Sequence, residues 1–406
     1  MQYAMLATIM FGSINSPPNP FSFGGLALDQ AFADRESEVQ ELKFDVLNGQ
    51  DVVIFAPRRY GKSSLVWRTM QQLVEADALV AYVNLMTAPT KERLAEKLAG
   101  AIYEGIASGS QRAREAVLTP FRGLRVSPRI TIEPGEGRYS FSFGVGHAPE
   151  DIDATLERLL ELPAELAAGG GRRVALVLDE FQEIEAIDPL LPRLMRTTFE
   201  QQPEVSRVYL GSKRHMMERI FNDENEPFWR SAKRIELGLI EPGDFVPFIV
   251  ERFTATRKSI HSGLVAELCA LTGGHPYATQ QLSYFLWEET PFDSTATPTG
   301  LLAAVEAVLR SEHTHFQLRW ESASVAQRLV LEALAAEPGR PMTRAYRDRH
   351  ELPSSATVQT ALRALEQREL VGRLTDGSHA VAEPFLAQWV RRLDAEPAQA
   401  AREERA

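Results

Sequence analysis

A short segment of the chain has the residue types and spacing of a phosphate-binding loop. It lies between an apolar run over 51–55 and a helix that we predict over 62–75. Its residues are Ala56, Pro57, Arg58, Arg59, Tyr60, Gly61, Lys62 and Ser63, with Ser64 next in the chain. They match the pattern G-x-x-x-x-G-K-[ST], except that Ala56 replaces the first glycine. Ala56 is small enough for the turn, but a left-handed backbone conformation would be strained there.

The chemistry of this pattern is the binding of ATP or ADP with Mg²⁺. Backbone N–H groups of the loop and of the helix that follows point toward an anion, and Gly61 allows the backbone to come close to it. We expect Lys62 to contact the β- and γ-phosphates and the Ser63 hydroxyl to ligate Mg²⁺.

Two acids end a second apolar strand, which we predict over 174–178. In the segment VALVLDE, Asp179 and Glu180 would lie at the carboxyl edge of a parallel sheet, where ligands of such sheets bind. Asp179 is then the second Mg²⁺ ligand, directly or through water, and Glu180 is the general base for the attacking water. The alternative is that both are solvated acids of a loop.

The elements around these motifs alternate between strands and helices, which indicates a parallel sheet covered on both faces. Further strands are expected over 78–85, 207–210 and 235–239, helices over 91–108 and 150–168, and an inserted β-hairpin at about 124–146. Only helical patterns follow from 241 to 320, and a compact block with a short hairpin from 322 to 395. The formal charge of −11 and the single cysteine exclude a generally basic nucleic-acid-binding surface, an intramolecular disulfide and a cysteine-cluster metal site. No apolar run reaches the length of a membrane helix, so we expect a cytoplasmic protein without membrane contact.

Several segments resemble the archaeal-type ATPases of the STAND branch, which are close to the AAA+ proteins. The segments PRRYGKSSL, LVLDEFQEI, YLGSKRHMM and LTGGHPYATQQL occur in the order found in that family, from about 20 to 390. The resemblance implies an α/β P-loop core with the AAA+-like strand order 5-1-4-3-2, then a helical lid and a winged-helix domain. The domains expected are a flexible tail (1–20), the ATPase core (21–240), the lid (241–320), the winged-helix domain (322–395) and a second tail (396–406).

The resemblance also assigns roles to six residues outside the two motifs. Ser212, after the fourth strand, corresponds to a sensor of the γ-phosphate or else caps the strand. Arg230 stands where an arginine finger would act on a neighbouring subunit, which implies a homo-oligomer; Arg234 or a surface ion pair is the alternative. His275 and Pro276 begin a lid helix against the nucleotide, where His275 contacts phosphate or satisfies the helix N-terminus. Phe32 and Arg35 line the adenine side, or belong to the core and to a cap.

The C-terminal block is the candidate for a further partner. Helices are expected over 329–334, 342–348 and 357–367, the last capped by Ser354 or Ser355 and followed by a wing over 371–381. The third helix would read DNA, with Arg363 and Arg368 beside Glu366 and Glu369. Because the net charge of this block is close to zero, we expect only weak binding to DNA phosphates. A role in intramolecular control of the ATPase is favoured instead.

The function expected is a switch that binds ATP with Mg²⁺, hydrolyses it slowly and acts on an unidentified protein partner. The alternatives are an ATP-controlled DNA-binding protein resembling replication initiators, and a nucleotide-binding scaffold without turnover.

Overall fold

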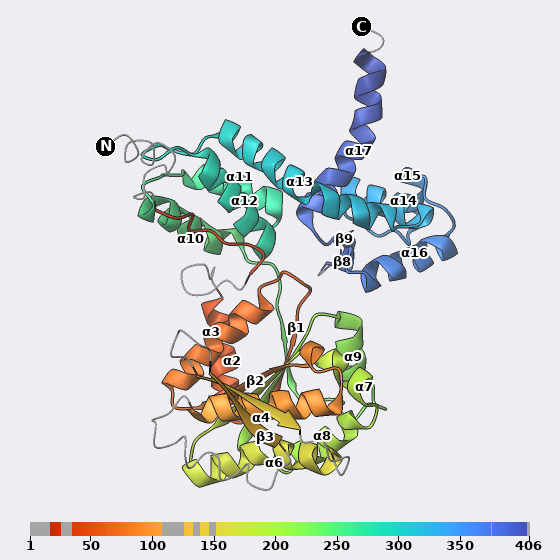
Figure 1. Cartoon of the computed structure of the whole chain (residues 1–406). Helices are drawn as coiled ribbons and strands as arrows, with labels where there is room; N and C mark the ends of the chain where they lie inside the picture. The colour runs from red at the N-terminus through yellow and green to blue at the C-terminus, as the bar shows by residue number, and fades with distance from the viewer. Residues whose placement is uncertain are drawn as a thin grey trace. The chain divides into compact units, whose positions relative to one another are not determined.

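The computed structural model describes residues 17–25, 35–107, 126–132, 139–145, 152–374 and 376–403 (Figure 1). Phe32 and residues 1–16 of the predicted tail lie outside this part of the chain. The structure divides into two compact units, which we call the sheet unit, Arg35–Gly238, and the helical unit, Met1–Asp34 with Leu239–Ala406.

The sheet unit is built around a parallel five-stranded sheet with the order β2-β5-β6-β1-β7. Its strands are β1 (Val52–Phe55), β2 (Leu79–Asn84), β5 (Val174–Asp179), β6 (Val205–Gly211) and β7 (Lys233–Glu236). Counted along the chain and read from the other edge, this is the predicted order 5-1-4-3-2, which is confirmed. The order makes β1, β6 and β5 neighbours, so the segments that follow these three strands meet at one edge of the sheet.

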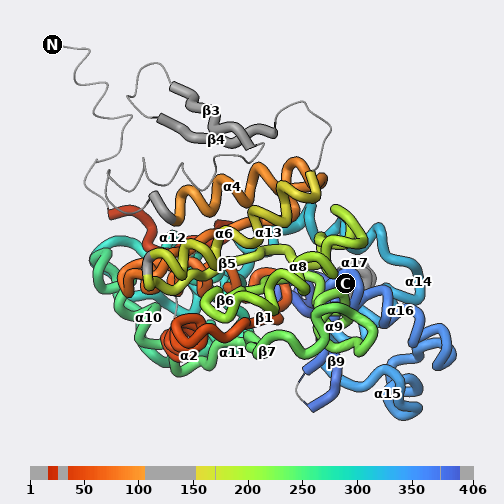
Figure 2. The backbone as a smooth tube through the Cα atoms, turned by 90° about the horizontal axis from the view of Figure 1, so that it is seen from below, coloured from red at the N-terminus to blue at the C-terminus, as the bar shows by residue number. Residues whose placement is uncertain are grey.

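Helices cover both faces of this sheet (Figure 2). The helices α2 (Glu36–Leu47) and α3 (Lys62–Glu75) pack against each other on one face. The other face carries α4 (Lys91–Ala107), α6 (Ile152–Gly170) and α8 (Leu191–Phe199), of which α6 contacts both α4 and α8. Because strand side chains alternate between faces, Leu79, Ala81 and Val83 join the core on the α4 side. Tyr82, at an intervening position, points to the α3 side.

Short elements complete the sheet unit. They are η2 (Leu85–Thr87), η3 (Phe181–Glu183), α7 (Ile184–Ile187), α9 (Arg214–Asn222) and the antiparallel pair β3 (Val126–Ile132) and β4 (Tyr139–Val145), which is the predicted hairpin. Strand β7 begins two residues before the predicted position, 235–239. It is an edge strand in which only Ile235 is buried, so its apolar residues do not mark its extent.

The helical unit begins with α10 (Pro242–Ala255), α11 (Ser262–Thr272), α12 (Pro276–Glu289) and α13 (Pro298–Glu321). Residues 17–25 also belong to it. Phe21 is buried and its ring contacts Phe248 and Phe253, while the Asn19 side chain donates a hydrogen bond to the carbonyl of Tyr284. The proline-rich segment is therefore packed against the first helices of this unit.

The C-terminal block of the helical unit has the three helices and the hairpin predicted for it, and a further helix at its C-terminal end, which continues into the predicted second tail, 396–406. They are α14 (Val325–Ala336), α15 (Arg344–Arg349), α16 (Ser355–Gln367), β8 (Val371–Arg373), β9 (His379–Val381) and α17 (Pro384–Glu403). Ser354 is the N-cap of α16, since its side chain accepts a hydrogen bond from the Thr357 N–H. One hydrophobic core runs through the whole unit, and the Trp389 ring of α17 contacts Phe316 of α13. The predicted lid and winged-helix segments thus share one core, with α17 packed against α13.

Candidate functional site: a phosphate loop and its facing acids

The loop after β1 has the backbone of an anion-binding turn. Gly61 is in the left-handed conformation, with φ of 82°, and is the N-cap of α3. The only other left-handed residue of the loop is Arg59, with φ of 67°. Ala56 is buried and does not adopt positive φ, so its methyl group is accommodated without the strain considered from the sequence. No side chain caps α3, and its first turn carries no acid, which suits an anion at this end.

The Arg35 side chain contacts this loop and stabilises it. Its guanidinium is buried and donates hydrogen bonds to the Tyr60 carbonyl over 3.2 Å and to the Gly238 carbonyl over 2.7 Å. It also forms an ion pair with Glu38 at 3.0 Å. These contacts place Arg35 beside the loop and tie the loop to the last residue of the sheet unit. The second residue predicted for the adenine side, Phe32, is outside the described residues.

Asp179 ends β5 at the same edge and is held on both carboxylate oxygens. The Tyr82 hydroxyl donates a hydrogen bond to Oδ2 over 2.6 Å, and the Glu180 backbone N–H donates to Oδ1 over 2.9 Å. Burial, followed by the neighbouring carboxylate of Asp179, raises the pKa of Tyr82 above its ordinary value. The phenol therefore stays protonated at neutral pH and remains a donor.

Glu180 lies next to it in the left-handed conformation, with φ of 52°. Its Oε2 accepts hydrogen bonds from Ser212 Oγ over 2.7 Å and from Gln182 Nε2 over 2.5 Å. Burial raises the pKa of the Glu180 carboxyl group, but Gln182, the Lys62 charge and Ser212 together outweigh it, so this pKa lies below its ordinary value. The structure therefore brings Lys62, Glu180 and Ser212, three predicted site residues from three segments, to one place.

The donor set fits Mg²⁺ bound together with a nucleotide. Mg²⁺ prefers oxygen ligands and in such sites takes one or two carboxylates, with phosphate oxygens and water completing the shell. The Ser63 hydroxyl in the first turn of α3 and the Asp179 carboxylate are groups of this kind. Within the described ranges, no cluster of three or more His, Cys, Asp or Glu side chains forms an all-protein metal site.

Arg230 and Arg234, the two candidates for the finger, differ in their surroundings. Arg234 forms ion pairs with Glu236 at 2.7 Å and Glu218 at 3.5 Å, and lies over the Phe55 ring. Arg230 is exposed, has φ of 50° and stacks on the exposed Trp229, with no ion pair among the residues described. Its loop is anchored by the fully buried Phe228. Both arginines are exposed, and Arg230 is the one without an ion pair among the described residues.

His275 and Pro276 belong to the helical unit. His275 is the N-cap of α12, where its Nδ1 accepts a hydrogen bond from the Ala278 N–H over 3.3 Å, and Pro276 is the first residue of the helix. His275 therefore satisfies the N-terminus of this helix, which was one of its two expected roles. The other, a contact with phosphate, stays a prediction.

Two residues beside the acids were not singled out from the sequence. Gln182 follows Glu180 by two positions, and Tyr82 lies on β2, the neighbour of β5. Tyr82 could have been identified only from the register of β2 and β5. Asn84 pairs with Asp179 in this register, and Tyr82, two residues before Asn84, lies on the same face of the sheet.

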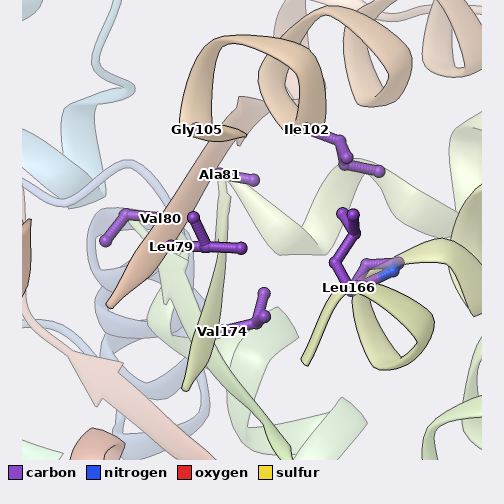
Figure 3. A pocket seen from close by; sticks show the side chains of 8 residues that line it. Leu79, Val80, Ala81, Ile102, Gly105, Leu166 and Val174 are labelled. Carbon is purple, nitrogen blue, oxygen red and sulfur yellow. The ribbon is translucent and has the colours of Figure 1, made fainter. Parts of the chain in front are cut away.

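The pocket drawn in Figure 3 is a separate feature. It is apolar and is lined by residues of β2, β5, α4 and α6, among them Leu79 and Val174, the first residues of their strands. It therefore lies at the amino end of the sheet, away from the loop and the acids.

Arg363 and Arg368, the two arginines predicted for a DNA-reading helix, differ in their contacts. Arg363 is exposed on α16. Arg368 donates hydrogen bonds to the carbonyls of Arg319 and Ser322 and to the Gln327 side chain, so it joins the end of α16 to the end of α13.

Comparison with known proteins supports the fold of both parts of the chain. A family model described as a probable winged helix domain matches residues 314–392. The Walker-type ATPase paby2304 of Pyrococcus abyssi is similar in structure, with a TM-score of 0.59 at 16% identity over 91% of this chain and 99% of that one. The ORC2 protein of Aeropyrum pernix, solved as ADPNP–ADP complexes, has a TM-score of 0.50 at 16% identity over 90% and 95% of the two chains. No curated protein matches the sequence.

Among the described residues, no helix is long and apolar enough to cross a membrane. The sheet order, the loop after β1 and the matched C-terminal domain agree with one another. The chain therefore has the fold of the AAA+-like P-loop ATPases, with a winged-helix domain at its C-terminal end.

Proposed function

We propose that the chain is a switch that binds ATP with Mg²⁺ and hydrolyses it slowly. The observation that carries this proposal is the contact of Glu180 with Ser212, next to the loop that contains Lys62. A base, a polar residue able to contact a γ-phosphate and a phosphate-binding lysine are the parts that ATP hydrolysis needs.

Each part has one task in this proposal. The loop N–H groups and Lys62 bind the phosphates, and Ser63 and Asp179 hold Mg²⁺, which would neutralise charge on the phosphates. Glu180 accepts a proton from the attacking water. With its pKa below its ordinary value, Glu180 is ionised at neutral pH and able to accept this proton.

The same contacts suggest how the nucleotide would be sensed. A γ-phosphate that takes the hydrogen bond of Ser212 releases one of the two side chains that hold Glu180. Arg35 connects the loop to Gly238, which is the last residue before the chain enters the helical unit. A shift of the loop on nucleotide exchange would therefore be transmitted through Arg35 to Gly238, where the chain passes from one unit to the other. ATP and ADP would favour different arrangements of these units, since only ATP makes the γ-phosphate contacts.

Nucleotide binding by Lys62→Ala is the first test. The loss of a charge-assisted contact to the phosphates should remove most of the affinity for ATP and ADP. Lys97→Ala, a change of an exposed lysine on α4 of the same unit, is the matched control and should bind as the parent does. Equal ATP affinity in Lys62→Ala and the parent, measured by titration calorimetry, would contradict the assignment of the loop. Binding without phosphate release in the parent would favour the scaffold.

A second candidate is ATP-controlled DNA binding through the winged-helix domain. It is favoured by the exposed face of α16, where Gln359, Thr360 and Arg363 are side chains of the kind that hydrogen-bond to base edges. DNA affinity that falls steeply as salt is raised, and that Arg363→Ala weakens, would support it.

A further inference from the structure

The Tyr82 side chain reaches the acid of the predicted magnesium site from a neighbouring strand. In the register of β2 and β5, Tyr82 pairs with Val177 and Asn84 pairs with Asp179. Tyr82 and Asp179 are thus diagonal neighbours on the face covered by α3, and the tyrosine is long enough to span this separation. The contact is a hydrogen bond of 2.6 Å from the hydroxyl to Oδ2.

The bond determines how Asp179 presents its oxygens. The carboxylate is buried, at 5% exposure, and its second oxygen is held by the Glu180 backbone N–H. With one donor on each oxygen, the plane of the carboxylate is defined, and each oxygen keeps a lone pair for a metal ion or a metal-bound water. Without the hydroxyl, Oδ2 would lose its only side-chain donor among the described residues and the carboxylate could turn.

The tyrosine is itself held by the helix that follows the loop. The Trp67 ring lies 5.6 Å from the Tyr82 ring, measured between centroids, at an interplanar angle of 40°. Trp67 is one helical turn after Ser63, so both the proposed hydroxyl ligand and the support of Tyr82 are carried by α3. The arrangement ties the two proposed magnesium ligands to one rigid element.

We propose that Tyr82 is a positioning residue for Mg²⁺, which orients the Asp179 carboxylate toward the metal bound with ATP. The inference rests on the proposed function and adds a residue that neither motif contains. Outer partners that orient a metal ligand typically contribute about 10- to 100-fold to metal affinity. Tyr82 contacts no substrate in this scheme and acts through Asp179.

Tyr82→Phe is the test, because it removes the hydroxyl and keeps the ring that packs on Trp67. ATP affinity is measured by titration calorimetry in EDTA and at increasing Mg²⁺. We expect the Mg²⁺ concentration for half-maximal enhancement of ATP binding to rise about 10- to 100-fold, and ATP affinity in EDTA to match the parent. Tyr209→Phe, a hydroxyl removed from the fully buried core of the same sheet, should leave both quantities unchanged.

The outcomes separate the possible explanations. A general structural defect would weaken ATP binding in EDTA as well, and this result would overturn the positioning role. An unchanged Mg²⁺ requirement in Tyr82→Phe would overturn it alone, leaving the proposed function in place. A parent chain that binds no ATP in either condition would overturn the proposed function and the role of Tyr82 together.

Discussion

Replacing Glu180 with glutamine separates the chemistry of the carboxylate from its contacts. The amide oxygen of glutamine can still accept the hydrogen bond that Ser212 donates over 2.7 Å, and the side chain keeps its volume. The change removes the negative charge and, with it, the ability to accept a proton from water. We therefore expect Glu180→Gln to bind ATP with at least the parental affinity, since it also removes an anion close to the phosphates, and to leave the ATP intact.

The expected losses in turnover and in stability are of different size. Removal of a general base lowers turnover about 10²- to 10⁴-fold, which is about 3 to 5 kcal/mol of barrier at about 1.4 kcal/mol per tenfold. The hydrogen bonds from Ser212 and Gln182 change from charged, at about 1.5 to 3 kcal/mol each, to neutral, at about 0.5 to 1.5 kcal/mol. Burial of a neutral amide costs less than burial of a carboxylate, which offsets part of this loss. The free energy of unfolding should therefore change much less than the barrier.

Phosphate release in a single turnover, with protein in excess over ATP, measures the effect on the barrier. Calorimetric ATP affinity and thermal unfolding measured in parallel give the other two quantities. The matched control is Glu185→Gln, which neutralises a nearby acid paired with Arg219 and should hydrolyse ATP at the parental rate. A parental rate in Glu180→Gln would refute the assignment of the base, and loss of ATP binding would show that Glu180 shapes the site instead.

Two further changes test the residues around this base. Burial raises the pKa of Glu180 while Gln182, Lys62 and Ser212 lower it, so Ser212→Ala should raise this pKa and move the acid limb of the turnover–pH profile to higher pH; a limb that does not move would disconnect Ser212 from the base. If Arg230 acts on a neighbouring copy, specific ATPase activity should rise with protein concentration, and Arg230→Ala should abolish the rise while Arg234→Ala preserves it. Flat activity across a hundredfold dilution of the parent, with a monomeric mass in ATP, would make Arg230 a surface residue.

The strands and the loop could be predicted because local patterns determine them, whereas the order of the strands was implied by the family resemblance. Continuous apolar runs mark strands buried on both faces, and β1, β2 and β5 are such runs. Strand β6 is buried throughout, although Ser206 and Arg207 interrupt its apolar residues. Strand β7 was placed two residues too late because it is an edge strand. Lys233 and Arg234 are paired with acids there, and the apolar Leu237 and Leu239 follow the strand.

Local patterns predicted the site only where sequence neighbours form it, and Ser212 was predicted from the family resemblance. Lys62 and Ser63 follow one strand, and Asp179 and Glu180 follow another, so the two motifs were visible at once. The contact of Tyr82 with Asp179 depends on strand register and on the reach of a side chain, which no local pattern contains. The preference for Arg230 over Arg234 likewise required their partners, because the two residues have the same charge and nearly the same position in the sequence.

In the winged-helix domain, the number of arginines in the sequence likewise does not show how many of them are available to bind DNA. A DNA-binding surface gains affinity from basic side chains that are available to phosphates. Arg368 instead uses its donors on the carbonyls of Arg319 and Ser322, at the C-terminal end of α13, where exposed carbonyl groups need partners. Arg349 forms an ion pair with the side chain of Glu337, the C-cap of α14. An arginine that holds helices together is not available to phosphates, so we expect fewer phosphate contacts, and a shallower salt dependence of DNA binding, than the number of arginines suggests. In the function that we propose, a domain that Arg368 fastens to α13, which is part of the lid segment, would transmit the nucleotide state rather than read a sequence of bases.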